Sequence, residues 1–244
     1  MFFDAHLHLD HLKADEIKKY LGLSKKNGID YFFVNSTSLK SNFQTKELAK
    51  KYKEVIPGFG LYPLESTKKD LKDFEKILET QKGKFFIGEI GLDYKFADEK
   101  QKEMQVEMFN SLLGLAKEYN VYVNVHSRYA QRQVMELLEK NKQEKVIMHW
   151  FCNSEKYVKK AADNGYYINI GPTYLFHNEQ KEIIEKVDKN LILFETDYPV
   201  EISGKSYASF ELKEVINKFC NDFNIQLKEI EKMQKQNFKE IIGK

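Results

Sequence analysis

Residues 85–126 read FFIGEIGLDYKFADEKQKEMQVEMFNSLLGLAKEYNVYVNVH, an apolar run, a stretch rich in Lys and Glu, and a second apolar run. Phe85–Leu92 and Val121–His126 have the length and apolar character of buried strands. Between them, the apolar residues of Gln101–Tyr119 recur with helical spacing. The segment therefore predicts a β-α-β unit whose two strands lie parallel in one sheet.

The same pattern repeats along the chain about every 30 residues. The other runs predicted as strands are Phe2–His8, Tyr31–Ser36, Val55–Leu61, Lys145–Trp150, Tyr166–Ile170 and Leu191–Thr196. The other segments with helical patterns are Asp70–Gln81, Gln131–Asn141, Ser154–Asn164, Asn178–Val187, Ala208–Asp222 and Leu227–Ile242, with Asn153 and Ser154 as candidate caps. Eight β-α units in 244 residues predict an α/β fold of the TIM-barrel type, (β/α)8, with a doubly wound open sheet as the alternative. Because no linker divides the chain, we expect a single domain over residues 1–244.

Composition narrows the class of protein. Apolar residues make up 42% of the chain and charged residues 31%, which is typical of a globular protein and excludes a disordered one. The formal net charge of +2 is too small for a protein that binds nucleic acid by overall charge, so any such contact must be local. Two distant cysteines, no signal-peptide pattern and no apolar stretch of about 20 residues predict a cytoplasmic protein with no membrane contact.

Several predicted strands end in side chains that can bind metal. In a barrel these strand ends meet at one face, where active sites lie. His6 and His8 are two residues apart on an extended segment and point to the same side. Glu89 lies inside an apolar run, where an ionised carboxylate is costly unless it is paired or metal-bound. The six candidate ligands are His6, His8, Glu89, His126, His149 and Asp197.

Each of these residues alone has an ordinary structural interpretation, as a hydrogen-bonded histidine or a capping carboxylate. Together, imidazole nitrogens and carboxylates suit Zn, Mn, Fe or Ni, whereas Mg prefers more oxygen ligands. Six converging ligands indicate a carboxylate-bridged pair of cations, which can activate water and polarise a phosphoryl or carbonyl oxygen. The pattern therefore predicts hydrolysis. The remaining histidines, His11 and His177, are predicted to be surface residues.

Taken in order, these motifs resemble the TatD family of metal-dependent deoxyribonucleases within the amidohydrolase superfamily of barrels. The matching segments are Asp4–Asp10 (DAHLHLD), Gly88–Tyr94 (GEIGLDY), Val125–Arg128 (VHSR), His149–Ser154 (HWFCNS), Asn169–Gly171 (NIG) and Glu195–Pro199 (ETDYP). The resemblance spans nearly the whole chain.

The resemblance implies two divalent cations, Mg, Mn or Zn, and assigns their ligands. One cation would be held by His6, His8, Glu89 and Asp197, and the other by Glu89, His126 and His149. Glu89 is then the bridging ligand, and Asp197 acts both as ligand and as general base. The implied reaction is hydrolysis of DNA phosphodiester bonds at an exposed end or in a single strand, with water activated by the cations attacking in line. DNA is then the expected partner, and no obligatory protein partner is indicated.

The segments expected to contact substrate depart from the family pattern. Family members usually carry Gly-x-His-Pro after the third strand, but this chain has Tyr62 in place of that histidine. Beyond Pro199, Val200–Lys205 replaces a longer basic loop. Arg128 and Tyr62 remain the predicted substrate-binding residues. These departures leave two alternatives open, a hydrolase of a small ester, amide or phosphate and a metal-binding protein without catalysis.

Aromatic side chains also lie near the predicted strand ends. Such side chains either stack against nucleic-acid bases or pack in the core. The candidates are Phe96, Tyr129, Trp150 and Tyr174.

Overall fold

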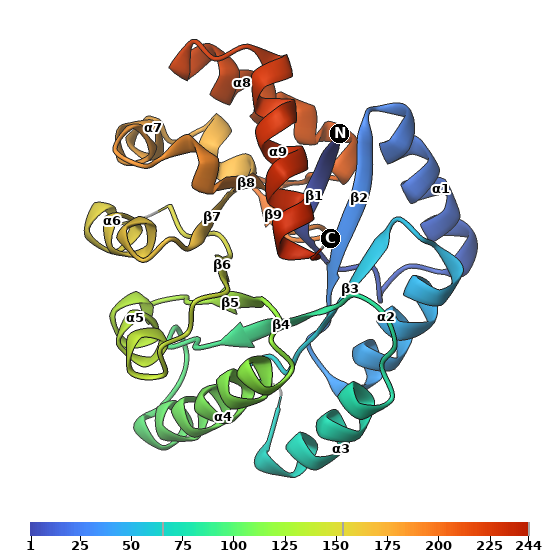
Figure 1. The fold of residues 1–244 in the computed structure, drawn as a ribbon, viewed down its shortest axis with the longest axis vertical. Helices are drawn as coiled ribbons and strands as arrows, with labels where there is room; N and C mark the ends of the chain where they lie inside the picture. Colours follow the sequence, from blue (N-terminus) through green and yellow to red (C-terminus); the bar gives the residue numbers. More distant parts are fainter. Residues whose placement is uncertain (65, 153, 244) are drawn as a thin grey trace.

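The computed structural model describes residues 1–64, 66–152 and 154–243, and its central feature is a sheet of eight parallel strands paired in sequence order (Figure 1). The strands are β1 (Phe2–Leu7), β2 (Ile29–Asn35), β3 (Val55–Phe59), β4 (Phe86–Gly91), β5 (Val123–His126), β6 (Val146–Met148), β7 (Tyr167–Ile170) and β8 (Ile192–Phe194). Backbone hydrogen bonds connect the first strand to the segment after the last. Asp197 N donates to His6 O at 2.9 Å, and His8 N donates to Tyr198 O at 2.7 Å. The predicted (β/α)8 barrel is confirmed, and the open-sheet alternative is wrong.

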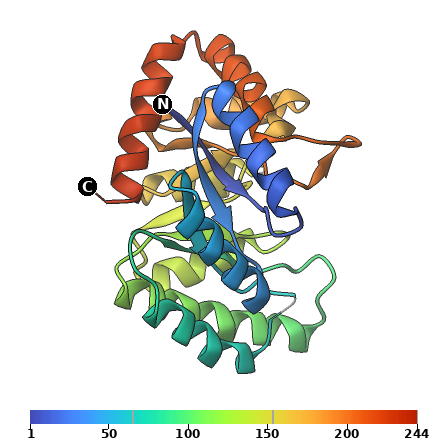
Figure 2. The same cartoon turned by 90° about the vertical axis from the view of Figure 1, so that its right-hand side faces the viewer.

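Helices surround the strands (Figures 1 and 2). They are α1 (Ala14–Lys26), α2 (Leu39–Lys51), α3 (Lys68–Glu79), α4 (Glu99–Glu118), α5 (Gln131–Lys140), α6 (Glu155–Asp163), α7 (Asn178–Glu185), α8 (Leu212–Phe223) and α9 (Leu227–Ile241). Short 3-10 turns lie at η1 (Pro172–Leu175), η2 (Lys189–Leu191) and η3 (Ser209–Glu211), and a small hairpin, β9 (Glu201–Ile202) with β10 (Lys205–Ser206), follows the eighth strand. In Figure 2 this hairpin, in orange, projects from the barrel. Within the described residues, none of the helices combines the length and apolar character needed to cross a membrane.

Aromatic side chains fill the barrel where its strands begin. Phe3 is the second residue of β1 and Phe86 is the first of β4, and both are almost fully buried. Phe238 of α9 packs 5.3 Å, centroid to centroid, from Phe3 and 5.9 Å from Phe33. The C-terminal helix therefore covers this end of the barrel, and the opposite end remains for a functional site.

Two strands have only half of their predicted length. The run Lys145–Trp150 forms a strand only over Val146–Met148, and Leu191–Thr196 only over Ile192–Phe194. The backbone leaves the extended conformation just beyond each strand, with φ of +46° at Trp150 and +54° at Asp197. Ser154 occupies the N-cap position of α6 without a side-chain capping bond, and Asn153, the other predicted cap, lies outside the described residues.

Gly91, at the end of β4, is a position where a side chain does not fit. Its φ is +142°, and a Cβ there would lie 2.0 Å from the carbonyl oxygen of His126. We expect Gly91→Ala to lower the free energy of unfolding by about 1–3 kcal/mol, measured by urea denaturation. Gly114→Ala is the matched control, because Gly114 is an exposed residue of α4 at which a Cβ would meet nothing within 4 Å. This substitution should instead raise the free energy of unfolding by about 0.5–1 kcal/mol. Equal stabilities of the two variants would contradict this account of Gly91.

Candidate metal centre

A cleft of about 820 Å³ opens at the carboxyl ends of the strands. Five of the six predicted ligands line it, and the sixth, His6, is fully buried. The lining ligands are His8, Glu89, His126, His149 and Asp197. The fold thus brings together side chains that lie as far apart in sequence as β1 and the segment after β8.

One group of ligand atoms lies on the β1 side of the cleft. The Nε2 atoms of His6 and His8 are 3.1 Å apart. Glu89 Oε2 lies 3.5 Å from the first of these nitrogens and 3.4 Å from the second. Asp197 Oδ1 lies 3.6 Å and 3.5 Å from the same two atoms. Two nitrogens and two oxygens therefore face a common point.

A second group lies toward β5 and β6. Glu89 uses its other oxygen here, with Oε1 at 2.8 Å from His126 Nδ1 and 3.9 Å from His149 Nε2. Asp197 Oδ2 lies 3.6 Å from His149 Nε2. Both carboxylates therefore extend between the two groups, with one oxygen toward each.

This donor set fits divalent cations. Ligand atoms about 2.0–2.2 Å from one tetrahedral cation are separated from each other by roughly 3.3–3.6 Å. The separations in the first group, from 3.1 Å to 3.6 Å, are close to this range. The triplets His6–His8–Glu89 and Glu89–His126–His149 each have their ligand atoms within 4.8 Å of one another. Glu89 and Asp197 are only 3% and 6% exposed, so the site offers negative charge that water does not neutralise.

The outer nitrogen of each histidine meets a fixed acceptor. The pairs are His6 Nδ1 with Asn124 Oδ1 (3.0 Å), His8 Nδ1 with the Asn35 carbonyl (3.0 Å), His126 Nε2 with Asp93 Oδ2 (3.3 Å) and His149 Nδ1 with Glu195 Oε2 (2.9 Å). A proton held on the outer nitrogen leaves the inner nitrogen as the lone-pair donor. These contacts orient all four rings toward the two carboxylates.

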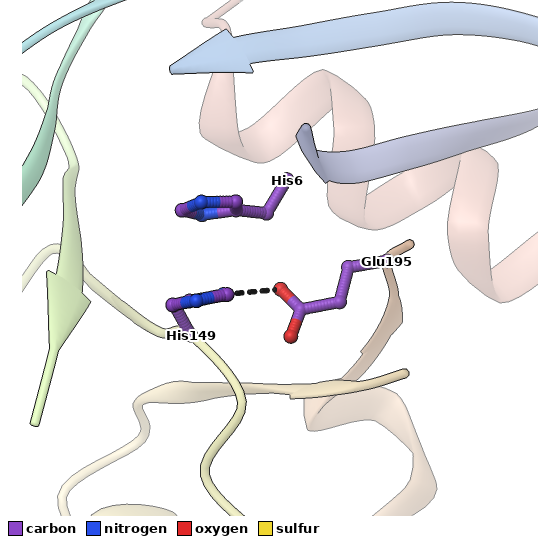
Figure 3. A group of neighbouring side chains, drawn as sticks. All are labelled: His6, His149 and Glu195. Atoms are coloured by element: carbon purple, nitrogen blue, oxygen red, sulfur yellow. Dashed lines mark hydrogen bonds and ion pairs between the residues drawn. The ribbon is translucent and has the colours of Figure 1, made fainter. Parts of the chain in front are cut away.

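Glu195 supports the site without lining the cleft. Figure 3 shows its carboxylate beside His149, whose ring stacks on His6 at 3.6 Å between centroids and 16° between planes. His6, His149 and Glu195 are close enough to be considered a third metal group. However, Glu195 already accepts hydrogen bonds from His149, from Trp150 N and from the Asn169 amide, and the two rings lie face to face. We therefore interpret Glu195 as an acceptor that holds His149, and its place in the ETDYP motif was the available sequence signal.

The electrostatics of the site follow from two buried carboxylates among imidazoles. Burial opposes ionisation of Glu89, but hydrogen bonds from His126 and other histidines hold its pKa well below the usual value. The pKa of Asp197 is lowered in the same way, against burial, chiefly by the charge of His149. Burial alone would lower the pKa of His149, but the carboxylates of Glu195 and Asp197 raise it to about 9. Without a cation, protons on the imidazoles therefore balance the negative charge.

The two predicted substrate-binding residues meet on a carboxylate that the sequence argument missed. The Tyr62 hydroxyl donates to Asp93 Oδ2 at 2.7 Å, and Arg128 contacts the same oxygen through Nε at 2.8 Å and Nη2 at 2.6 Å. Despite the opposing effect of burial, hydrogen bonds from His126, Arg128 and Tyr62 lower the pKa of Asp93 below its ordinary value. Asp93 lies within the GEIGLDY motif, which was the signal that could have identified it.

The other sequence candidates have mixed outcomes. Tyr129 and Trp150 line the cleft, and Phe96 is 74% exposed. Tyr174 follows the second alternative and packs in the core, because its side chain is fully buried and its hydroxyl donates to Asp222 at 2.8 Å. His177 is exposed as predicted, and it also lines the cleft.

We expect Glu195→Gln to weaken binding of a divalent cation about 10–100-fold, because an acceptor that fixes the orientation of His149 is lost. Metal titration of the chelator-treated protein measures this change, with circular dichroism as the check on folding. Glu201→Gln, on the exposed hairpin strand β9, is the matched control and should leave the affinity unchanged. Equal affinities in the two variants would show that Glu195 does not support the site.

Comparison with known proteins agrees with this geometry. A family model described as TatD related DNase matches residues 3–243. An uncharacterized metal-dependent hydrolase, YabD of Bacillus subtilis, is 28% identical over 207 residues, 82% of this chain and 80% of its own. Human deoxyribonuclease TATDN3 is 29% identical over 211 residues, 80% of this chain and 77% of its own.

A solved structure agrees in fold. The crystal structure of YjjV, a TatD homologue from Escherichia coli K12, superposes with a TM-score of 0.91 and 24% identity, covering 99% of this chain and 97% of that one. The family model spans almost all of this sequence. The chain therefore belongs to the TatD-related DNase family of metal-dependent hydrolases.

Proposed function

We propose that this chain is a deoxyribonuclease that hydrolyses phosphodiester bonds of DNA with two divalent cations. Its family already makes it a metal-dependent hydrolase acting on ester bonds. The two-cation proposal rests on the position of the Glu89 carboxylate. Its two oxygens face two separate groups of imidazole nitrogens. The name of the human relative, a deoxyribonuclease, supports DNA as the substrate.

The donor set determines which residues would hold the cations. One cation would take His6, His8, Glu89 and Asp197, and the other Glu89, His126 and His149. Mg, Mn and Zn are the candidates, and the share of imidazole nitrogen favours Mn or Zn. When bound, such cations supply Lewis acidity toward water and toward a phosphoryl oxygen.

The chain's own residues would move the proton and hold the substrate. Asp197 is ionised, because its pKa is lowered, and it lines the cleft, so it can accept the proton of the attacking water. Arg128 lines the same cleft with a side chain 40% exposed, and its guanidinium can donate to a phosphate oxygen.

A second candidate function is hydrolysis of a small phosphate ester. The charge of Arg128 is already paired with Asp93, and the cleft is also lined by the carboxylate of Glu179. Such a cleft neutralises one phosphate more readily than a long polyanion. We therefore expect a shallow salt dependence if DNA is the substrate.

Metal binding should strengthen as pH rises. The pKa of His149 is about 9 in the cation-free site, so below that pH a cation must displace a proton before this nitrogen can coordinate. We expect the apparent affinity to increase from pH 6 to pH 9. Titration calorimetry in two buffers of different ionisation enthalpy counts the protons released. An affinity independent of pH, with no protons released, would contradict this assignment of His149.

The function is tested with end-labelled single-stranded DNA and purified protein supplied with Mg, Mn or Zn, beside chelated protein. We expect metal-dependent trimming that falls about 10²–10⁴-fold in Asp197→Asn, because the proton acceptor is lost. Asp163→Asn, on the exposed surface of α6, is the matched control and should retain the activity. Trimming that persists unchanged in Asp197→Asn would reveal a contaminating nuclease. DNA that stays intact while bis(p-nitrophenyl) phosphate is cleaved would favour the second candidate.

A further inference from the structure

Tyr62 lies on the wall of the cleft, but its single hydroxyl proton does not face the cleft. The hydroxyl oxygen is 2.7 Å from Asp93 Oδ2, and an ionised carboxylate can only accept a hydrogen bond. The proton of Tyr62 is therefore committed to Asp93.

Asp93 is held firmly in this role. Its side chain is fully buried, and Arg128 donates to the same oxygen from both Nε and Nη2. Its backbone is fixed from α4, because Asp93 N donates to Gln105 Oε1 at 2.8 Å and Gln105 Nε2 donates to the Asp93 carbonyl at 3.0 Å. Turning the Tyr62 proton into the cleft would give up a short hydrogen bond to an ionised carboxylate, which is among the stronger hydrogen bonds in proteins.

His126 Nε2 also lies 3.3 Å from the Tyr62 oxygen and 3.3 Å from Asp93 Oδ2, so it can occupy one of the two lone pairs of the hydroxyl. What Tyr62 offers a ligand is thus the remaining oxygen lone pair. A tyrosine hydroxyl keeps its proton at neutral pH, because even its unperturbed pKa is about 10. A phosphate oxygen placed against Tyr62 would meet a second acceptor. A hydroxyl group placed there would donate a hydrogen bond.

We propose that Tyr62 is a specificity-determining residue that accepts a hydrogen bond from a hydroxyl of the substrate's sugar, while Arg128 takes the neighbouring phosphate oxygen. The nature of this ligand rests on the proposed function, since a nucleotide carries a hydroxyl and a phosphate on one sugar. A strand end with a free hydroxyl is then preferred at this wall, and a terminal phosphate there is disfavoured.

Binding of uncleaved mononucleotides to the metal-loaded protein tests this proposal. Trp150, the one tryptophan of the sequence, lines the cleft and reports binding through its fluorescence. The probes are thymidine 5′-monophosphate with its 3′-deoxy analogue, and thymidine 3′-monophosphate with its 5′-deoxy analogue. In one pair we expect the deoxy compound to bind about 3- to 10-fold more weakly, the range of one hydrogen bond. Tyr62→Phe should abolish the difference within that pair.

Inorganic phosphate provides the complementary measurement. Because Tyr62 donates nothing toward the cleft, Tyr62→Phe should keep the phosphate affinity within about twofold, whereas Tyr62→His, which adds a donor, should strengthen it. A fivefold loss of phosphate affinity in Tyr62→Phe would overturn the proposal, as would equal binding within both nucleotide pairs. If DNA stays intact in the nuclease assay while the protein still binds a mononucleotide more tightly than its deoxy analogue, the proposed function is rejected and this assignment of Tyr62 is kept.

Discussion

Two carboxylates, Glu89 and Asp197, carry negative charge into the mouth of the barrel, where water solvates them poorly. An uncompensated charge in such a place is strongly destabilising, so the fold must supply positive partners. It supplies four imidazoles. Burial lowers the pKa of His6, whereas the neighbouring carboxylates raise the pKa of the other three, which hold an extra proton when no cation is present. All four can give a lone pair to a cation when one binds. Much of the surrounding structure follows from keeping these groups in place.

The layer behind the histidines couples this centre to the rest of the barrel. Asn124, on β5, turns its oxygen toward His6 because its amide nitrogen is bonded to the Ala5 carbonyl. The backbone of Asp93 is hydrogen-bonded to a side chain of α4, and the Glu195 carboxylate accepts a hydrogen bond from the Trp150 backbone. A change in strand register or helix position would therefore displace the ligands. The precision of the centre depends on side chains that never enter the cleft.

Most of the barrel and the positions of the candidate ligands could be predicted from sequence, because apolar runs mark buried strands and polar residues at their ends stand out. Glu89 is the clearest case, as a carboxylate inside an apolar run. The acceptors Asp93 and Glu195 could not be separated from ordinary loop residues, since their roles depend on which atoms face them across the barrel. For Tyr174 the sequence could not decide between base stacking and core packing, and η1 turns its ring into the core, 6.3 Å from that of Phe219 on α8.

The backbone hydrogen bonds that close the barrel also determine when, during synthesis of the chain, the metal ligands can come together. His6 and His8 bond through their backbones to Asp197 and Tyr198, so the first strand is completed by residues near the far end of the chain. During translation at about 5–20 residues per second, the histidines leave the ribosome many seconds before Asp197 does. A nascent chain therefore carries an incomplete ligand set for most of its synthesis. The cation proposed for the group that includes Asp197 can therefore find its full ligand set only after the eighth strand has emerged.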